Sequence, residues 1–197
     1  MIAQADNPYL AAQTTLKNRA ARALWGLACL LLFRTSPRPL HRWRAALLRC
    51  FGARLGRDCH IYPKARIWAP WNLRCDDGAA IANDAVIYNA AEVHLGTHAI
   101  VSEQAYICTA THDMDDPAFP MVTAPISLGR YAWVCARASV LPGVTVQEGA
   151  VLSLGSVAVR DLDAWHVYAG VPARSIRERR RHDSFPFAVQ DQVPTPY

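Results

Sequence analysis

The chain has 197 residues, a formal net charge of +5 and a hydrophobic content of 52%. This composition excludes a disordered chain and predicts one domain with an apolar core. Its six cysteines lack the spacing of a zinc site, and the apolar run 23–33 is shorter than the roughly 20 residues of a membrane span. Because the N-terminus also lacks the basic start of a signal peptide, we expect free thiols and a cytoplasmic protein.

Residues 1–54 are expected to form an N-terminal helical segment in front of the main domain. Its first part, 1–13, is loose and polar in composition. Leucines and alanines at helical spacing predict a helix over 14–33, which Thr14 or Thr15 can cap. The prolines that follow end this helix, because proline cannot continue a helix interior.

A second helix is predicted over 39–51, with apolar residues on one side, arginines near the other and Gly52 as its stop. The helix pair has two interpretations. One is a cap, because a stack of repeats exposes an apolar end that must be covered. The other is a membrane-surface patch, because aromatic and basic residues alternate along the segment. We favour the cap.

An aliphatic residue then recurs at every sixth position, with two small shifts and one long interruption. The ladder consists of Leu55, Ile61, Ile67 and Leu73, then Ile81, Ile87 and Val93, then Leu95, Val101 and Ile107, and finally Leu128, Val134, Val140, Val146 and Leu152. The fifth position of each repeat is small almost throughout. A period of six fits neither a helix nor a simple strand, and it is typical of a β-helix. We therefore predict a mainly β fold, with the β-helix over 55–173.

The long interruption, residues 108–127, is the best candidate for chemistry, because function concentrates in loops that leave a rigid scaffold. It contains Thr111, His112 and Asp113 in succession. After the ladder, the charged stretch Arg174 to Arg181 predicts a short C-terminal helix. The tail from His182 to the end of the 174–197 segment is expected to be disordered.

Several motifs together resemble the left-handed β-helix acyltransferases. They are the hexads, Thr111-His-Asp, Tyr131-Ala-Trp-Val, Val140-Leu-Pro-Gly-Val-Thr-Val and Ala169-Gly-Val-Pro-Ala-Arg. Within that superfamily the chain looks like the colanic acid biosynthesis acetyltransferases. The narrower match is carried by Arg42-Trp-Arg-Ala, followed by Leu47-Leu-Arg and Phe51-Gly-Ala, and by Tyr106-Ile-Cys-Thr with Thr111-His-Asp. The resemblance spans roughly residues 25–180.

The resemblance implies a left-handed parallel β-helix of about five triangular coils and a homotrimer with active sites between subunits. It implies acetyl-CoA as the donor substrate and His112 as the general base on an acceptor hydroxyl. Histidine suits this role, because its pKa lies near working pH. Asp113 could orient the imidazole or bind the acceptor, although a backbone carbonyl could orient it instead. Asn89 matches an acceptor-binding position, or it is a turn residue that satisfies backbone groups.

The resemblance also assigns a CoA groove. Trp133, Ala136, Leu154 and Val159 would line the pantetheine arm. Arg160, Arg174 and Arg177 would lie near the CoA phosphates, with solvated surface charges as the alternative for each. Many relatives have serine or glycine where this chain has Ala136 and Leu154, which affects side-chain contacts but leaves the groove in place.

The implied function is an acetyl-CoA-dependent O-acetyltransferase of bacterial surface polysaccharide biosynthesis, acting on a sugar, nucleotide-sugar or lipid-linked oligosaccharide. Peripheral contact with the inner face of the membrane is an option. Neither a metal nor a nucleic-acid partner is expected. The alternatives are a non-catalytic scaffold and a zinc-dependent carbonic anhydrase, for which His94 and His98 have the wrong spacing. Trp68 and Trp71 could stack on a sugar or a lipid carrier, or pack against the N-terminal helices, which we favour.

Overall fold

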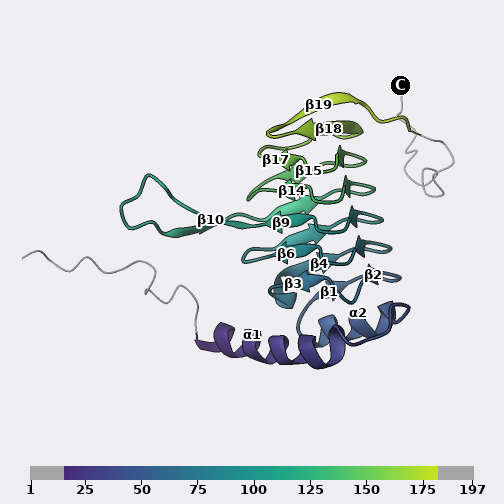
Figure 1. The fold of residues 1–197 in the computed structure, drawn as a ribbon, viewed down its shortest axis with the longest axis vertical. Coiled ribbons are helices and arrows are strands. Elements are labelled where there is room, and N and C mark those ends of the chain that lie inside the picture. The colour runs from purple at the N-terminus through teal and green to yellow at the C-terminus, as the bar shows by residue number, and fades with distance from the viewer. Residues whose placement is uncertain (1–15, 182–197) are drawn as a thin grey trace, which may run out of the picture.

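A computed structural model of the protein describes residues 16–181. The expected loose segment 1–13, the helix cap at Thr14 or Thr15 and the tail from His182 lie outside the described residues. Within this range the chain winds into a left-handed β-helix with helices at one end and a hairpin projecting from its side (Figure 1).

Short parallel strands stack into three sheets, which are the three sides of the coil. Sheet A consists of β1 (Arg54–Leu55), β4 (Leu73–Cys75), β7 (Val93–Leu95), β12 (Ile126–Leu128) and β15 (Thr145–Val146). Sheet B runs through β2 (His60–Ile61), β5 (Ala80–Ile81), β8 (Ile100–Val101), β13 (Trp133–Val134), β16 (Val151–Leu152), β18 (His166–Gly170) and β19 (Ala173–Glu178). Sheet C consists of β3 (Arg66–Ile67), β6 (Val86–Tyr88), β9 (Tyr106–Cys108), β14 (Ser139–Val140) and β17 (Val157–Ala158). The expectation of about five coils is therefore confirmed.

The aliphatic ladder is the core of the coil. In sheet B, Ile61, Ile81, Val101, Val134 and Leu152 stand in register in successive coils and are fully buried. The small fifth-position residues, such as Ala99 and Ala132, are buried at the bends. Each aliphatic side chain contributes roughly 1.5–3 kcal/mol by its removal from water, so the stacked columns hold the fold together.

The irregularities of the ladder all lie at one corner, where the chain passes from sheet C to sheet A. Cys75 and Leu95 stand in register with Leu55, whereas Leu73 and Val93 pair with each other two residues earlier, so the assignment of Leu73 and Val93 to the ladder was wrong. The first two coils each carry two extra residues at this corner, and the third coil carries the 108–127 insertion there. The two small shifts in the ladder therefore have one structural origin, which is the pair of extra residues that each of the first two coils carries at this corner.

The N-terminal helices cover the first coil, as the cap interpretation predicts. They are α1 (Leu16–Ala28), the π-helical turn η1 (Cys29–Phe33) and α2 (His41–Cys50). Trp25 is buried, packs on Phe33 and Phe51, and donates its indole N–H to the carbonyl of Ile67 at 2.7 Å. These aromatic side chains cover the apolar end of the repeat stack, which would otherwise be exposed to solvent.

Arg44 is fully buried at this end, although the pattern placed it on the polar side of the second helix. Its guanidinium donates to the carbonyls of Ile61, Pro37 and Arg38 and to the Ser36 hydroxyl, over 2.6–2.8 Å. These acceptors come from the coil and from the link before α2. Arg44 therefore ties the cap to the first coil, and burial lowers its pKa.

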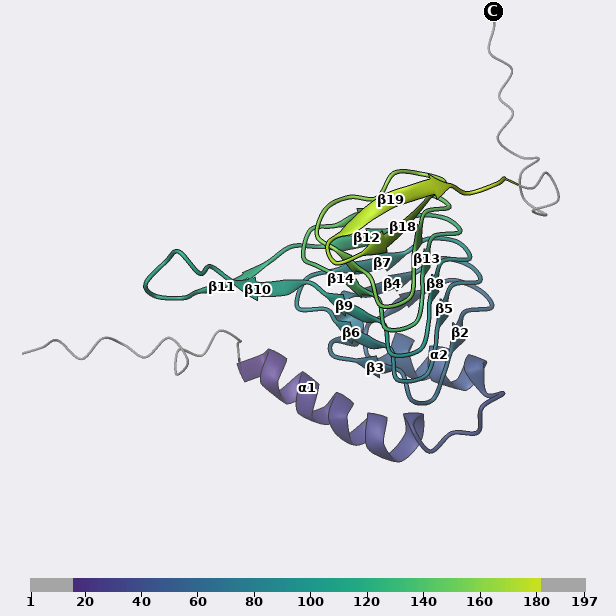
Figure 2. The same ribbon diagram turned by 45° about the horizontal axis from the view of Figure 1, so that its top comes forward.

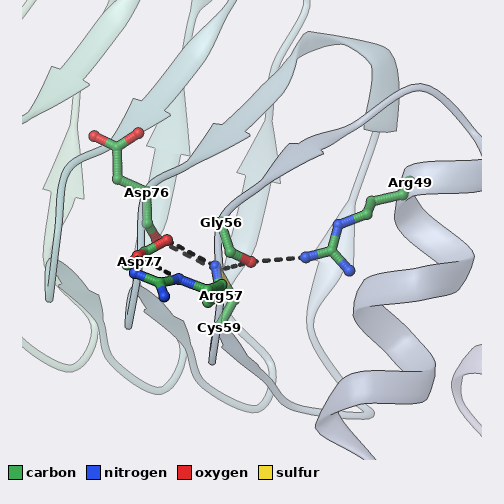
Figure 3. A network of polar contacts seen from close by, with 6 residues as sticks. All are labelled: Arg49, Gly56, Arg57, Cys59, Asp76 and Asp77. Carbon is green, nitrogen blue, oxygen red and sulfur yellow. Dashed lines mark hydrogen bonds and ion pairs between the residues drawn. The ribbon is translucent and has the colours of Figure 1, made fainter.

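A second polar network joins α2 to the first two coils (Figure 3). Arg49 donates to the carbonyls of Leu55 and Gly56, the latter at 2.7 Å. Asp77 of the next coil accepts the backbone N–H and the guanidinium of Arg57 at 2.7 and 2.9 Å. These hydrogen bonds from the Arg57 backbone and side chain lower the pKa of the Asp77 carboxyl.

The C-terminal helix expected over 174–181 is wrong. Residues Ala173–Glu178 form β19, which pairs antiparallel with β18. The physical reason is the open edge of sheet B, because β18 would otherwise present unpaired backbone groups to solvent. Gly170, with φ +100°, permits the reversal between the two strands.

In the 16–181 range, the helices are too short or too polar for any of them to cross a lipid bilayer.

Candidate active site

His112 stands on a hairpin that leaves the third coil. β10 (Ala110–His112) pairs antiparallel with β11 (Met121–Thr123), and His112 lies opposite Met121. Figure 2 shows this hairpin reaching away from the coil stack. The chain continues from β9 directly into β10, so the rigid coil positions the root of the hairpin.

The imidazole of His112 is oriented by Phe119, seven residues further along the hairpin. Its Nδ1 lies 2.8 Å from the carbonyl oxygen of Phe119, and its ring stacks on the Phe119 ring at 4.6 Å with an interplanar angle of 6°. A carbonyl oxygen only accepts, so Nδ1 carries the proton. In the neutral ring Nε2 then holds a free lone pair and can act as a base.

Asp113 does not orient His112. Its carboxylate accepts the backbone N–H of Asp115 at 3.0 Å, and its own N–H bonds to the carbonyl of Pro120. The side chain is exposed on the hairpin. Of the two possibilities drawn from the sequence, the structure has the backbone carbonyl as the orienting group. Phe119 itself was missed, because nothing in one sequence tells an orienting aromatic from another loop residue.

Asn89 has a structural role in this subunit. It is fully buried, and its side-chain amide exchanges two hydrogen bonds with the backbone N–H and carbonyl of Ala69, at 2.9 and 2.6 Å. Thr109, also fully buried, bonds to the carbonyl of Tyr88 and to the N–H of Ala91 one coil below. Both side chains form hydrogen bonds to the backbone of the widened corner between sheets C and A and so hold it in place. The turn interpretation of Asn89 thus describes its contacts better than acceptor binding.

Aromatic side chains follow the outer face of sheet C toward the hairpin. The rings of Trp68 and Tyr88 lie 5.4 Å apart edge to face, and in the next coil Cys108 stands in register with Tyr88, with Tyr106 two residues before it. Burial, together with the neighbouring Cys108 and Tyr88, raises the pKa of Tyr106, so its phenol stays protonated. Arg22 of α1 lies over the Trp68 ring at 4.5 Å, as expected for packing against the N-terminal helices.

A groove of about 620 Å³ opens between α1 and sheet C. Trp25, Leu30 and Trp68 are among its apolar lining residues, and Arg22 and Arg66 are among its basic ones. It lies in the first two coils, below the level at which β9 leaves for the hairpin.

Three of the four predicted pantetheine residues, Trp133, Ala136 and Leu154, lie at or near the corner between sheets B and C. Ala136 and Leu154 lie one above the other there, and the N–H of Gly155 donates to the Ala136 carbonyl at 3.1 Å. Leu154 is 70% exposed and Trp133 of β13 is 41% exposed. The Trp133 indole donates to the Ser102 hydroxyl at 2.8 Å, which fixes its plane. Exposed apolar side chains at a coil corner are suited to lining a pantetheine arm.

The remaining candidates lie elsewhere on the coil. Val159 and Arg160 follow β17, at the corner between sheets C and A, about 10 Å and two coils from the hairpin root at the usual strand spacing. Arg174 and Arg177 are exposed on β19. Their guanidinium groups bond only to nearby backbone carbonyls among the contacts of the described chain.

One subunit does not assemble these residues into one site. Ala136 precedes the strands of sheet C, whereas Val159 and the hairpin follow them, so the two groups lie at opposite ends of that sheet. The hairpin that carries His112 projects away from its own coil (Figure 1). Within one subunit, the hairpin and the corner that carries Ala136 and Leu154 therefore lie apart.

No metal site competes with this arrangement in residues 16–181, where no group of three or more His, Cys, Asp or Glu side chains could hold an ion. His94 bonds to Asp76 at 2.9 Å. His98 lies in a turn, and its ring stacks on the Tyr131 ring with 5.4 Å between the ring centroids. All six cysteines are free thiols, as expected.

Comparison with known proteins gives the family. No protein-family model matches the chain. The chain is 38% identical over 156 residues to WcaF of Escherichia coli K12, a protein named for colanic acid biosynthesis acetyltransferase activity, and the match covers 79% of this chain and 86% of that protein.

Two solved structures share the fold. A hexapeptide-repeat acetyltransferase of Vibrio cholerae, solved with acetyl coenzyme A, superposes with a TM-score of 0.76 at 22% identity, covering 85% of this chain and 92% of its own. A maltose O-acetyltransferase of Clostridium difficile superposes with a TM-score of 0.75 at 20% identity, covering 85% and 90%. Together with the long WcaF match, these findings mean that the chain is an acyltransferase of the colanic acid biosynthesis acetyltransferase family, built on the hexapeptide-repeat β-helix.

Proposed function

We propose that the protein transfers the acetyl group of acetyl-CoA to a sugar hydroxyl in the biosynthesis of a bacterial surface polysaccharide. The orientation of His112 by the Phe119 carbonyl carries this proposal, because it leaves Nε2 free to accept a proton. The names of the relatives support the chemistry: one refers to colanic acid biosynthesis and another to the O-acetylation of maltose. The acceptor class is a sugar, a nucleotide-sugar or a lipid-linked oligosaccharide.

The reaction proceeds in a ternary complex without an acyl-enzyme. His112 Nε2 removes the proton from the acceptor hydroxyl as the oxygen attacks the thioester carbonyl. The tetrahedral intermediate carries an oxyanion, which backbone N–H groups stabilise. Collapse of the intermediate breaks the C–S bond, and the CoA thiolate takes the proton from His112. The products are the acetyl ester and free CoA, and the histidine returns to its neutral form.

The site is proposed to form between subunits of a homotrimer. The hairpin of one subunit places His112 beside the corner between sheets B and C of the next subunit. There Trp133, Ala136 and Leu154 hold the pantetheine arm. Val159 and Arg160 border the donor, and Arg174 and Arg177 contact its phosphates, since arginine matches phosphate oxygens with a planar fork. The split of these residues across one subunit supports the assembly. Asp113 remains available at the acceptor side, because its carboxylate is exposed.

The test is the variant His112→Ala, assayed by thiol release from acetyl-CoA with candidate sugars. Turnover is expected to fall by about 10²–10⁴, the usual contribution of a positioned base, while the melting temperature stays unchanged. The matched control is Met114→Ala, which removes an 82% exposed side chain of the same hairpin and should leave turnover near the wild-type value. Light scattering should give the mass of three chains for all variants. Near-wild-type turnover of His112→Ala would place the base elsewhere, and a stable, active monomer would contradict the shared site.

A further inference from the structure

α1 and η1 carry an exposed apolar stripe, here called the leucine face. It consists of Leu16, Leu24, Leu27, Leu30 and Leu31, which are 57–80% exposed. Their spacing of three, four and eight places them on one side of the helix. The opposite side carries Trp25 and Phe33, which are buried against the coil. A helix that is apolar on both sides leaves one of them needing cover, and a contiguous exposed apolar patch marks an interaction site.

The segment of the sequence that carries the leucine face has charges of one sign only. Between residues 7 and 57 the sequence contains no aspartate or glutamate. The basic residues of this stretch are Lys17, Arg19, Arg22, Arg34, Arg38, Arg42, Arg44, Arg49, Arg54 and Arg57. Because the whole chain has a net charge of only +5, the rest of it is net acidic. Arg19 and Arg34 are exposed beside the leucines, so the surface combines apolar contact with attraction for anions.

Further apolar side chains extend the leucine face at the same end of the molecule. Leu32, Leu40 and Trp43 are 45–46% exposed. The Trp43 indole donates to the Leu32 carbonyl at 3.1 Å, which holds the ring of α2 against the end of η1. Both helices lie at one end of the coil stack, opposite β18 and β19 (Figure 1). Tryptophan is enriched where a protein meets the headgroup region of a bilayer.

The groove beside α1 adds an independent sign of an anionic ligand. The Nε of Arg22 is buried and has no hydrogen-bond partner among residues 16–181. Arg34 and Arg66 line the same groove, together with Leu30 of the leucine face. A phosphate group at the groove mouth would meet three guanidinium groups, and arginine binds phosphate oxygens in two-point contacts.

We propose that α1 and η1 dock the protein on an anionic lipid bilayer, with the leucine face in the acyl boundary and the flanking arginines on lipid phosphates. The helix lies flat, because its other side is fixed to the first coil through Trp25. A second copy of the chain is the poorer occupant, because two such faces in contact would bring like charges together. The docking itself does not depend on the proposed function. Only one further point rests on that function, namely that the sugar acceptor is carried by a lipid.

Flotation of the full chain with vesicles tests the docking. Vesicles of phosphatidylcholine alone are compared with vesicles containing about 30 mol% phosphatidylglycerol, at low and high salt. The protein should float with the anionic vesicles and be released by salt. The triple variant Leu24→Ser, Leu27→Ser, Leu31→Ser should bind at least about tenfold more weakly, since binding scales with buried apolar area. Ile176→Ser, which alters an exposed apolar residue at the opposite end, should bind like the wild type.

A charge pair of variants separates the electrostatic part. Arg19→Glu with Arg34→Glu should abolish the preference for anionic vesicles, whereas Arg180→Glu with Arg181→Glu makes the same charge change at the other end and should leave it. Equal binding of the leucine variant and the wild type would overturn the proposal. So would a leucine variant whose oligomeric mass changes while its vesicle binding does not, because the face would then be a protein interface.

The vesicle readout is independent of catalysis. His112→Ala protein should float like the wild type. Docking without acetyl transfer to any sugar would leave the lipid surface standing and remove the proposed function, and acetyl transfer without docking would do the reverse.

Discussion

Two regions of the molecule differ in how their side chains are buried and how their strands pair: the fourth and fifth coils, and the hairpin 108–127. In the coils, Leu128, Val134 and Val140 are fully buried, and every corner repeats the one before it. In the hairpin most residues are exposed or half-buried, and two short strands pair only with each other. The coils are rigid because the same packing repeats from coil to coil. The hairpin carries His112 outside the coil stack. Substitutions should therefore act on stability in the first region and on turnover in the second.

The largest difference is expected between Val140→Asp and Val122→Asp. Val140 is fully buried between Ile107 and Ala158, so a carboxylate there costs about 4 kcal/mol of unfolding free energy or more. Val122 is 42% exposed on the hairpin, and the same change should cost under about 0.5 kcal/mol. Urea unfolding measures both. A Val140→Asp protein that unfolds like the wild type would break the comparison.

A smaller loss of stability is expected at the widened corner. Asn89→Ala leaves the N–H and carbonyl of Ala69 without their partners, at a cost of about 2 kcal/mol. Asn83→Ala is the matched control, because Asn83 accepts a single exposed hydrogen bond from Lys64. Turnover and the acceptor KM of folded Asn89→Ala protein should match the wild type. If the Asn89→Ala variant had a raised acceptor KM and unchanged stability, Asn89 would instead be an acceptor-binding residue.

The smallest effect is expected at Phe119. Phe119→Ala keeps the carbonyl that orients His112 but removes the stacked ring, and such ring contacts are worth about 0.5–1.5 kcal/mol. The kcat should fall by up to about tenfold, with the KM for acetyl-CoA and the melting temperature unchanged. Met114→Ala, which removes an 82% exposed side chain of the same hairpin, is the control. Wild-type kcat in Phe119→Ala protein would mean that the carbonyl alone orients the imidazole.

The repeat predicted most of the fold because its physics is local. Ile61, Ile81 and Val101 recur at a fixed spacing only if each fills the same place in successive coils. The same logic located the 108–127 insertion, since a segment without the period cannot stack. Leu73 was misplaced because it is as apolar as a ladder residue, and only the strand register distinguishes it from Cys75.

Other features depend on which surfaces meet, and one sequence does not contain that information. The period of Leu24, Leu27 and Leu31 predicted the first helix, but only the packing of Trp25 shows that these leucines face outward. Arginine is usually a surface residue, yet Arg44 is enclosed by four acceptors that come from two separate segments, the link before α2 and the first coil. β19 reads as a charged helix, and the free edge of β18 overrides that local preference.

The concentration of every extra residue at the corner between sheets C and A has a consequence for how such a protein can change. Segments inserted there lengthen the circuit of a coil without altering the hydrogen-bond ladder above or below it. The corner is therefore a natural grafting point, where a hairpin of different length or sequence can be exchanged while the scaffold keeps its own stability.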